Sequence, residues 1–452
     1  MQLSNININN PDILLPAFKD NSIPVVFSSS EKYAKYLSVC LASIKKNSSN
    51  TTNYDIVILD NGIHPETKTK LLNFINFNNF SLRFYDMHTH FKQFNQNESD
   101  FYFTDNLSIS TYYRFFVPDI FKNYKKIIFI DADTLVFEDL KYLYKTDLNN
   151  HILGAVHDYG ISAFFKIADW VRSCINNTTK NTFSYFNAGV LLFNVEKARI
   201  ENFTNKILKL NAITPNEHKI LYDQDILNNY FKGNIEFLDP RWNVLLNVVN
   251  AMYLLYDFEK NKFSEYKYSL QNPYILHFAG DKPWNNLSVY HANTWWNYAK
   301  QTPFYETIVI ESLQEKENTI NKNNTQLSFY SQHGTAKQRI QNQLSYKLGQ
   351  TFIINSKTIL GILLIPIFLF ATIISHKQEQ KKYRIKIKKD PLLKLPPLEE
   401  YPDYEEAIKF KNHLSYQLGQ TLIHSFKFWY KGKILTLPLQ IIKLYKNFKK
   451  KV

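Results

Sequence analysis

The sequence of 452 residues contains only two cysteines, Cys40 and Cys174, and eleven glycines. Two cysteines exclude a disulfide framework and a cysteine-rich zinc site, so a reducing compartment is the default expectation. No two glycines are separated by a single residue, which excludes a G-x-G-x-x-G dinucleotide turn, and no G-x-x-x-x-G-K-[ST] phosphate loop is present. A nucleotide bound by this chain must therefore be held by something other than a glycine-rich loop.

The first residues of the sequence are not expected to act as a secretory signal peptide. Residues 1–20 are rich in asparagine and lack an apolar core, so we expect them to form a flexible leader. Apolar residues make up 44% of the chain and charged residues 21%, which is the composition of a folded protein.

The positive charge is concentrated in the C-terminal part of the chain. The formal net charge is +14, and residues 376–452 carry about 18 Lys and Arg against about 7 Asp and Glu, so that about +11 lies there and about +3 in the first 375 residues. A basic segment can meet nucleic acid or an anionic lipid surface through the same attraction. The neighbouring residues favour the lipid surface, and nucleic-acid binding is not expected.

An uncharged apolar stretch, residues 358–374, precedes the basic segment and contains Pro366 in its middle. At 17 residues it is at the short limit for crossing a bilayer. Crossing with the preceding part of the chain in the cytoplasm would also put the basic segment outside, against the positive-inside tendency. We favour a segment that lies in or along one leaflet, and a spanning helix and a buried helix are the alternatives.

Short apolar runs alternate with helical patterns through the first half of the chain. This order predicts an α/β fold with a largely parallel central sheet flanked by helices. Ligands of such sheets bind at the carboxyl ends of the strands, where Asp131 falls. The predicted strands are 22–28, 54–59, 82–85, 125–130, 152–156, 186–193 and 235–238, and the predicted helices are 32–46, 65–77 and 224–231.

A repeat divides the chain into domains. LSYKLGQT at 344–351 returns as LSYQLGQT at 414–421, and Ala336, Ile340, Leu344 and Leu348 recur every four residues, which predicts one basic amphipathic helix. We therefore expect a leader at 1–20, a catalytic domain at 21–327 and a membrane-associating region at 328–452. The repeat copies lie near 336–352 and 406–422. A solvated helical hairpin is the alternative for this region.

The motif with the clearest chemistry is IIFIDADTLVFEDL, in which Asp131 and Asp133 follow an apolar strand. Alternate residues of an extended chain project to the same side, so both carboxylates can reach one cation. Two aspartates that only end a strand are the alternative reading of the pair.

This motif resembles the metal and nucleotide-sugar motif of glycosyltransferase family 8, which includes bacterial lipopolysaccharide galactosyl- and glucosyltransferases. Three further segments resemble that family in the same order: YFNAGVLLFN at 185–194, YDQDILN at 222–228 and HFAGDKPW at 277–284. The resemblance implies a GT-A type nucleotide-diphospho-sugar transferase fold.

By the resemblance, Asp131, Asp133 and His277 are the ligands of a divalent cation, Mn²⁺ with Mg²⁺ as the alternative. A hard cation bound by carboxylates and an imidazole can absorb the charge that develops on a departing diphosphate. Lys282 would supply a positive charge to the diphosphate, and Gly280 would let the backbone approach it.

The resemblance also implies which residues line the site of the donor, a UDP-sugar. Tyr33 would stack on the base, and Ser30 stands where the family often has Asp. Arg114 would reach the sugar and phosphate region, and Asp158 would line the sugar pocket. Packing in a helix is the alternative for Tyr33, and a structural salt bridge for Arg114 and Asp158. The full donor-site set is Ser28, Ser30, Tyr33, Arg114, Asp131, Ala132, Asp158, Asn187, Ala188, Gly280 and Lys282.

The family retains the configuration of the donor sugar, and the residue nearest the anomeric carbon would here be Gln224. An amide is a poor nucleophile, which favours a front-side route in which the departing phosphate helps to deprotonate the acceptor. Asp223 would hold sugar hydroxyls.

The resemblance thus implies a retaining α-glycosyltransferase that moves galactose or glucose from a UDP-sugar to a saccharide or lipid-linked saccharide in lipopolysaccharide synthesis. Its expected location is the cytoplasmic face of the inner membrane, as a peripheral protein. The alternatives are a non-catalytic nucleotide-sugar or glycan binder on a degenerate scaffold, and self-glucosylation in the manner of glycogenin.

Overall fold

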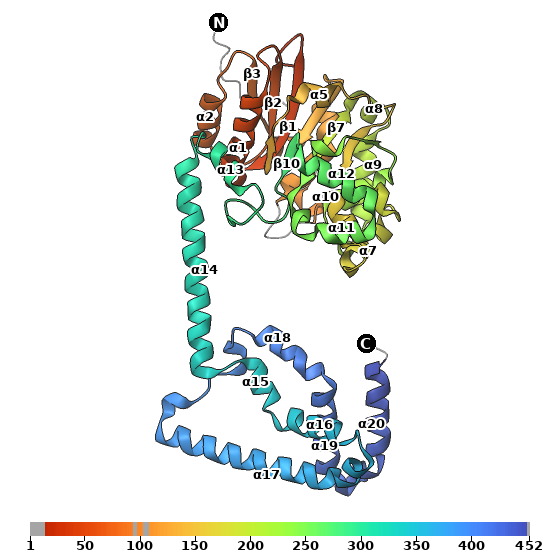
Figure 1. The fold of residues 1–452 in the computed structure, drawn as a ribbon, viewed down its shortest axis with the longest axis vertical. Coiled ribbons are helices and arrows are strands. Elements are labelled where there is room, and N and C mark those ends of the chain that lie inside the picture. The colour runs from red at the N-terminus through yellow and green to blue at the C-terminus, as the bar shows by residue number, and fades with distance from the viewer. Residues whose placement is uncertain (1–13, 94–96, 103–107, 450–452) are drawn as a thin grey trace. The chain divides into compact units, whose positions relative to one another are not determined.

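The structure is a computed structural model that describes residues 14–93, 97–102 and 108–449. It divides into two compact units, Met1–Glu315 and Lys316–Val452 (Figure 1). Each unit is described here by itself. Residues 1–13 of the expected leader lie outside the described residues.

The first unit is built on a seven-stranded sheet with the order β3-β2-β1-β4-β7-β6-β8. Strands β3, β2, β1 and β4 run parallel, β7 is antiparallel to both β4 and β6, and β8 is parallel to β6. The strands are β1 (Ser22–Ser30), β2 (Asn53–Asn61), β3 (Phe80–Asp86), β4 (Lys126–Ile130), β6 (Leu153–His157), β7 (Phe186–Asn194) and β8 (Glu236–Phe237).

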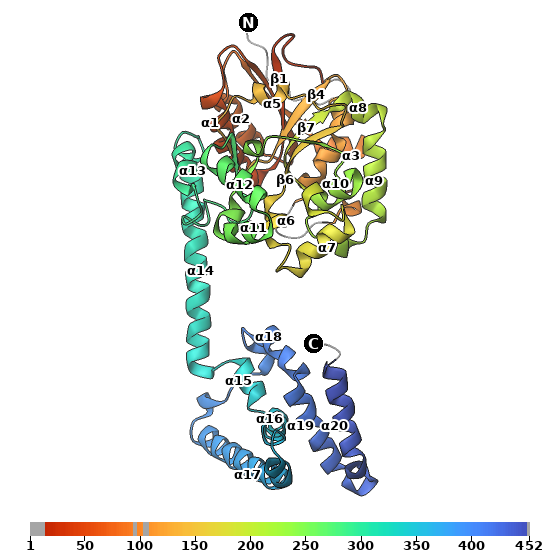
Figure 2. The same ribbon diagram turned by 45° about the vertical axis from the view of Figure 1, so that its right-hand side comes forward.

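Alternation along the strands gives the sheet two buried faces. Val25 and Phe27 of β1 belong to one apolar core, and Val26 between them belongs to the other. Because successive side chains of a strand point to opposite faces, a continuous apolar run requires helices on both sides. Figure 2 shows helices on both faces of the sheet.

The helices of this unit are short, and several begin at the edge where the parallel strands end. Helix α1 follows β1 directly, and α6 follows β6 after a single residue. The helices are α1 (Glu31–Asn47), α2 (Pro65–Phe74), α3 (Met87–Gln93), α4 (Val117–Ile120), α5 (Leu140–Lys145), α6 (Tyr159–Phe164), α7 (Asp169–Asn177), α8 (Val195–Ile200), α9 (Phe203–Ile213), α10 (Asp223–Phe231), α11 (Met252–Phe258), α12 (Lys260–Gln271) and α13 (Ala292–Ala299).

The α/β sandwich with a mostly parallel central sheet is therefore confirmed. A second sheet of three short strands, in the order β5-β10-β9, was not predicted. Its strands are β5 (Thr134–Val136), β9 (Val244–Leu245) and β10 (Ile275–His277). Strands of two or three residues are too short to carry a period-two pattern, so the sequence gives no signal for them.

The second unit is helical. A continuous helix, α14 (Tyr305–His333), contains the division between the units, whereas the change in residue character placed the boundary at Leu327. The remaining helices are α15 (Ala336–Gln341), α16 (Leu344–Asn355), α17 (Ile359–Lys389), α18 (Tyr404–Ile408), α19 (Leu414–Lys427) and α20 (Lys433–Lys449).

The single amphipathic helix expected from Ala336 to Leu348 is wrong. Helix α15 starts with a capping box formed by Thr335 and Gln338, and Gln343 is extended (φ −67°, ψ 145°) before α16 begins. Ala336, Ile340 and Leu348 are nevertheless buried. The four-residue spacing therefore marked three buried side chains and the half-buried Leu344, but it could not detect the break between two short helices.

Candidate active site

The predicted site residues come from the edge of the sheet where the parallel strands end. Asp131 follows β4, and Asp158 follows β6 and caps α6. Because β7 runs the opposite way, it starts at this edge with Phe186. The backbone N–H of Asp131 donates to the carbonyl of Gly189 on β7 (2.8 Å).

His277 reaches the same edge through the small sheet. Strand β10 pairs antiparallel with β5 so that His277 lies opposite Thr134, and the N–H of Phe278 donates to the carbonyl of Asp133 (3.0 Å). Residues far apart in the sequence are thus brought together by strand register.

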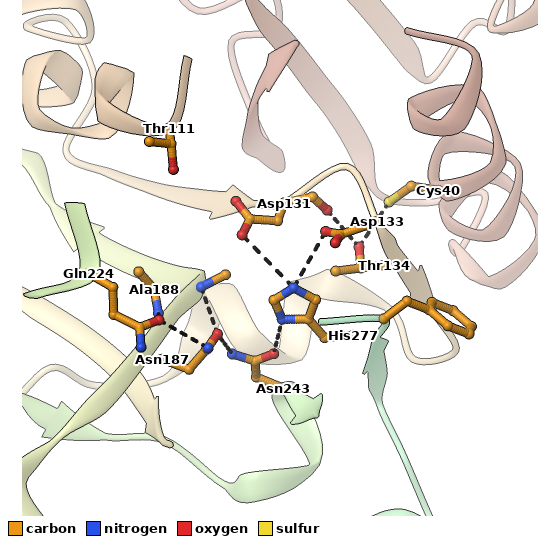
Figure 3. Close-up of polar contacts among 12 residues, drawn as sticks. Cys40, Thr111, Asp131, Asp133, Thr134, Asn187, Ala188, Gln224, Asn243 and His277 are labelled. Carbon is orange, nitrogen blue, oxygen red and sulfur yellow. Dashed lines mark hydrogen bonds and ion pairs between the residues drawn. The ribbon is translucent and has the colours of Figure 1, made fainter. Parts of the chain in front are cut away.

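Asp131, Asp133 and His277 each direct one ligand atom toward a shared point (Figure 3). The Nε2 atom of His277 lies 3.4 Å from Oδ1 of Asp133 and 4.0 Å from Oδ2 of Asp131. The other oxygen of each aspartate contacts a cationic side chain, Arg114 for Asp131 and Lys282 for Asp133.

This geometry fits a small divalent cation. The three ligand atoms lie within 4.8 Å of one another. Ligands of a cation of this size stand about 3 to 4 Å apart when each is about 2.1 Å from the ion. Carboxylate and imidazole donors suit Mn²⁺ and Mg²⁺, so the residues present fit the predicted metal site.

A chain of amides fixes which nitrogen of His277 is free. The backbone N–H of Gly189 can only donate, so the atom of Asn187 that it contacts at 2.9 Å is the carbonyl oxygen Oδ1. That oxygen also receives Nδ2–H of Asn243 (2.8 Å), which leaves Oδ1 of Asn243 facing Nδ1 of His277 (3.0 Å). Nδ1 therefore donates its hydrogen to Asn243, and Nε2 is the nitrogen that faces the two aspartates and is available to a cation.

Gly189 leaves the space that the His277 ring occupies. A Cβ atom at this position would lie 2.2 Å from Cε1 and 2.6 Å from Nδ1 of His277. The glycine is therefore required by the close approach of the ring.

Gln224 is held at both ends of its amide. Its Oε1 accepts from the backbone N–H of Ala188 (3.0 Å) and from Asn187 (3.1 Å), and its Nε2 donates to Oδ2 of Asp158 (3.0 Å). Asn187 donates to the same oxygen of Asp158 (3.1 Å). The structure thus brings together the predicted donor-site residues Asp158, Asn187 and Ala188 and the predicted catalytic residue Gln224.

Arg114 is buried among protein groups. Its Nη2 donates to Asp131 (2.9 Å), its Nη1 donates to the carbonyl of Ala188, and its Nε lies 2.9 Å from Oδ2 of Asp223. Thr111 donates its hydroxyl to the other oxygen of Asp223 (2.7 Å). Burial raises the pKa of Asp223 to about 6, although Arg114 and Thr111 act in the opposite direction. Arg114 therefore orients Asp131 and Asp223.

Lys282 contacts Asp133 and also donates to the carbonyl of Phe278 (2.8 Å). Burial acts to raise the pKa of Asp133, but Lys282 and His277 outweigh it and hold this pKa well below its usual range. Asp133 is therefore ionised at neutral pH.

Gly280, two residues before Lys282, has φ +85°, a left-handed conformation that favours glycine.

The predicted base-binding residues lie at the end of β1 and the start of α1. Ser28 and Ser30 are half-buried at the end of β1, and Tyr33 is half-buried in the first turn of α1. The Tyr33 ring lies edge-on to Trp284 (6.5 Å between centroids). Ala132 is buried between the two aspartates. The roles of these residues stay predictions.

Asn243 and Thr111 were not predicted as site residues, and the close approach of the His277 ring to Gly189 was not predicted either. Asn243 precedes β9, whose Leu245 lies beside His277 of β10. Asparagine before a short strand is also an ordinary turn residue, so the sequence alone could not separate these roles. Gly189 lay inside a quoted motif, and a glycine within a strand was the one available signal of a close approach.

Comparison with known proteins gives two profile matches. A profile described as "Glycosyl transferase family 8" matches residues 24–288, and a profile described only as a domain of unknown function matches residues 276–450. General stress protein A of Bacillus subtilis is 27% identical over 276 residues, which cover 59% of this chain and 89% of that protein.

Two other relatives match over smaller shares of their own length. The lipopolysaccharide 1,3-galactosyltransferase of Salmonella typhimurium is 25% identical over 206 residues, 44% of this chain and 56% of that protein. The solved apo structure of the bifunctional glycosyltransferase WbbM has a TM-score of 0.58 at 29% identity and covers 66% of this chain and 53% of that chain.

The first profile covers more than half of the chain and contains every predicted site residue. The GT-A type fold and the resemblance are therefore confirmed, and the chain belongs to glycosyl transferase family 8.

Proposed function

We propose that this glycosyltransferase moves a hexose, galactose or glucose, from a UDP-sugar to a saccharide acceptor with retention of configuration. The observation that carries the proposal is the convergence of Asp131, Asp133 and His277 beside the amide cluster of Asn187 and Gln224. One set of groups suits a cation and a diphosphate, and the other suits sugar hydroxyls.

Asp131, Asp133 and His277 would hold the divalent cation, Mn²⁺ or Mg²⁺. When bound, the cation supplies a Lewis acid for the negative charge that develops on the departing diphosphate. Lys282, which contacts Asp133, would add a positive charge beside the same phosphate groups. Arg114 would keep Asp131 oriented through its hydrogen bond.

The fixed amide of Gln224 supports a front-side route. Its oxygen already accepts two hydrogen bonds, and its nitrogen donates to Asp158, so the side chain is oriented and not poised as a nucleophile. In this route the bond from the anomeric carbon to the phosphate oxygen breaks while the acceptor oxygen bonds to the same face. The acceptor proton passes to the departing phosphate. Asp223 would hold sugar hydroxyls.

The acceptor is proposed to be a saccharide or lipid-linked saccharide of the lipopolysaccharide pathway, used at the cytoplasmic face of the inner membrane by a peripheral enzyme. The named activity of the Salmonella relative supports the acceptor class. The basic C-terminal segment supports the location. Cell fractionation tests the location: the enzyme should be found with inner membranes, and a fully soluble enzyme would contradict it.

Donor hydrolysis tests the activity directly. UDP-glucose, UDP-galactose and UDP-N-acetylglucosamine are compared at fixed Mn²⁺, and one of the two hexoses should be the preferred donor. Asp133→Asn keeps the side-chain shape but removes a ligand charge, so hydrolysis should be lost while the thermal unfolding curve is preserved. Full activity of this variant would refute the metal site.

Two outcomes separate the alternatives. Binding of UDP-sugars without any hydrolysis or transfer would favour the non-catalytic binder. A product of inverted configuration by NMR, or a covalent sugar adduct on Gln224 or Asp223, would refute the front-side route.

A further inference from the structure

The C-terminal unit consists of two copies of one arrangement. The motif N-x-L-S-Y-x-L-G-Q-T occurs at residues 342–351 and 412–421 with identity at eight of ten positions, and it starts α16 and α19. A short helix precedes each motif helix, α15 before α16 and α18 before α19. A helix with an internal proline follows each, α17 with Pro366 and α20 with Pro438.

The two motif helices cross at their glycines. A Cβ atom at Gly349 would lie 1.7 Å from the carbonyl oxygen of Ser415, and a Cβ at Gly419 would lie 1.6 Å from that of Ser345. Both pairs join equivalent positions of the two copies, so the contact is reciprocal, as across a two-fold axis. The serine and glycine spaced four apart let the two backbones touch, as in closely packed helix pairs.

The crossing places the two following helices in equivalent positions. Helix α17 packs on α16 and α20 packs on α19, and Figure 2 shows α19 and α20 side by side. One apolar cluster joins Ile365 and Leu369 of α17 to Leu348 and Leu422 of the motif helices, with Leu437 of α20 packed against it. Each copy thus contributes one following helix to a common core.

Both following helices also carry apolar side chains that the protein leaves exposed. The α17 apolar segment, residues 359–374, belongs to a helix whose most apolar stretch is only 6% buried. In the α20 apolar segment, residues 434–442, Leu435 is 84% and Leu439 is 70% exposed. Exposed apolar surface on this scale marks an interaction site. The exposed bulky residues of the α17 apolar segment are Ile359, Leu360, Ile362, Leu363, Ile367, Phe368, Phe370 and Ile374.

Exposed cations follow each apolar segment on the same helix. They are Lys377, Lys381, Lys382, Arg384, Lys386, Lys388 and Lys389 on α17, and Lys443 and Lys446 on α20. Apolar side chains followed by lysines fit acyl chains bordered by anionic headgroups, and they do not fit a purely apolar protein surface.

By length and composition alone, helix α17 is long and apolar enough to cross a membrane. Its uncharged apolar segment and the α20 apolar segment are both shorter than a bilayer core, which favours insertion into one leaflet. An α-helical stretch of 16 residues, such as 359–374, rises about 24 Å, which is less than the hydrocarbon core of about 30 Å. The α20 apolar segment has nine residues and is shorter still.

We propose that the C-terminal unit binds the surface of an anionic bilayer through two apolar segments, one from each copy, held in fixed geometry by the glycine crossing. Two weak attachments on one rigid unit act in series, so each raises the effective concentration of the other. This binding does not depend on the transferase activity.

Vesicle flotation of the full chain tests the partner. Vesicles of phosphatidylglycerol and phosphatidylethanolamine should bind at least about tenfold more protein than phosphatidylcholine vesicles, and high salt should weaken the binding. Equal binding to both vesicle types, or none to either, would overturn the proposal.

Paired variants test the two attachments. Leu363→Glu with Ile367→Glu changes the α17 apolar segment, and Leu435→Glu with Leu439→Glu changes the α20 apolar segment. Each pair should weaken vesicle binding about tenfold or more, and the two pairs together should abolish it. Wild-type binding after either pair of changes would overturn the two-site proposal.

A matched control uses equally exposed apolar residues of the first unit. Ile200 and Ile213 are 79% and 77% exposed, and changing both to glutamate should leave vesicle binding unchanged. Donor hydrolysis and thermal unfolding of all variants should match the wild type, because every substituted side chain is exposed and outside the active site.

Two further measurements distinguish binding to one face of a bilayer from contact with a second copy of the chain and from a helix that spans the bilayer. If the apolar segments instead contact a second copy of the chain, the paired variants would change the mass measured by light scattering, which overturns the proposal. For a spanning helix, single cysteines at Leu327 and Lys446 would be labelled by an impermeant maleimide from opposite sides of inner-membrane vesicles. The proposal expects labelling from the same side, and the two native cysteines are buried.

Discussion

Replacing Gly189 with alanine would place a methyl group where the His277 ring lies. The new Cβ would be 2.2 Å from Cε1 of the ring, and ordinary contact begins at 3.4 Å, so the ring must withdraw by about 1.2 Å (3.4 − 2.2). Strand β7 itself cannot withdraw easily, because the carbonyl of Gly189 accepts from the N–H of Asp131 and the N–H of Gly189 donates to Oδ1 of Asn187.

A displacement of this size is large for a metal ligand. Metal–ligand distances tolerate changes of about 0.2 Å, and disturbed ligand orientation commonly lowers metal affinity about 10- to 100-fold. We therefore expect the dissociation constant for Mn²⁺ of Gly189→Ala to rise by about 10- to 100-fold, measured by electron paramagnetic resonance or calorimetry on the metal-free protein. Donor hydrolysis should fall and recover partly at high Mn²⁺.

A double-mutant cycle identifies the path of the effect. If Gly189→Ala acts through His277, adding it to His277→Ala should change the affinity for Mn²⁺ no further. An affinity of Gly189→Ala within about twofold of the wild type would refute the reasoning, as would two fully additive effects in the cycle.

Three further predictions concern the amide chain, a buried carboxyl and the glycine crossing. Asn243→Asp keeps a hydrogen-bond acceptor for His277, whereas Asn243→Leu removes it. The affinity for Mn²⁺, measured by calorimetry, should therefore fall about tenfold more in the leucine variant than in the aspartate variant. Equal losses of affinity in the two variants would contradict the role assigned to Asn243. Burial raises the pKa of Asp223 from 3.8 to about 6. The folded chain therefore keeps a proton that the unfolded chain loses, and the free energy of unfolding should decrease by at most about 3 kcal/mol as pH rises from about 4 to about 6. Burial also raises the pKa of Asp225 to about 6, so Asp223→Asn should show a smaller decrease over this pH range in urea unfolding, and not a complete loss of it. A decrease equal to that of the wild type would contradict the role of Asp223. Gly349→Ala or Gly419→Ala should each destabilise the second unit by about 1 to 3 kcal/mol or more, seen as faster proteolysis of that unit with donor hydrolysis unchanged. Proteolysis at the wild-type rate would contradict the close crossing.

Much of the first unit could be predicted because its signals are local. KKIIFI predicted β4 within one residue, since a continuous apolar run flanked by charge is typical of a strand buried on both faces. The convergence of Asp131 and Asp133 followed from alternation along an extended chain.

The partners of His277 could not be predicted in the same way. Its contact with Asn243 depends on the pairing of β9 with β10, two strands of two and three residues without a periodic pattern. The orientation of Asn243 depends in turn on a backbone N–H of another strand. The break between α15 and α16 was missed because the buried residues of these two successive helices have the same four-residue spacing as those of one continuous helix.

The pairing of β5 with β10 has a consequence for how this enzyme can vary. Because His277 meets Asp133 across two hydrogen-bonded strands, the long polypeptide between them can gain or lose loops without moving the imidazole. One residue inserted within β10 would instead turn the imidazole to the opposite side of the small sheet. Tolerance to insertion should therefore change abruptly at the borders of these three-residue strands.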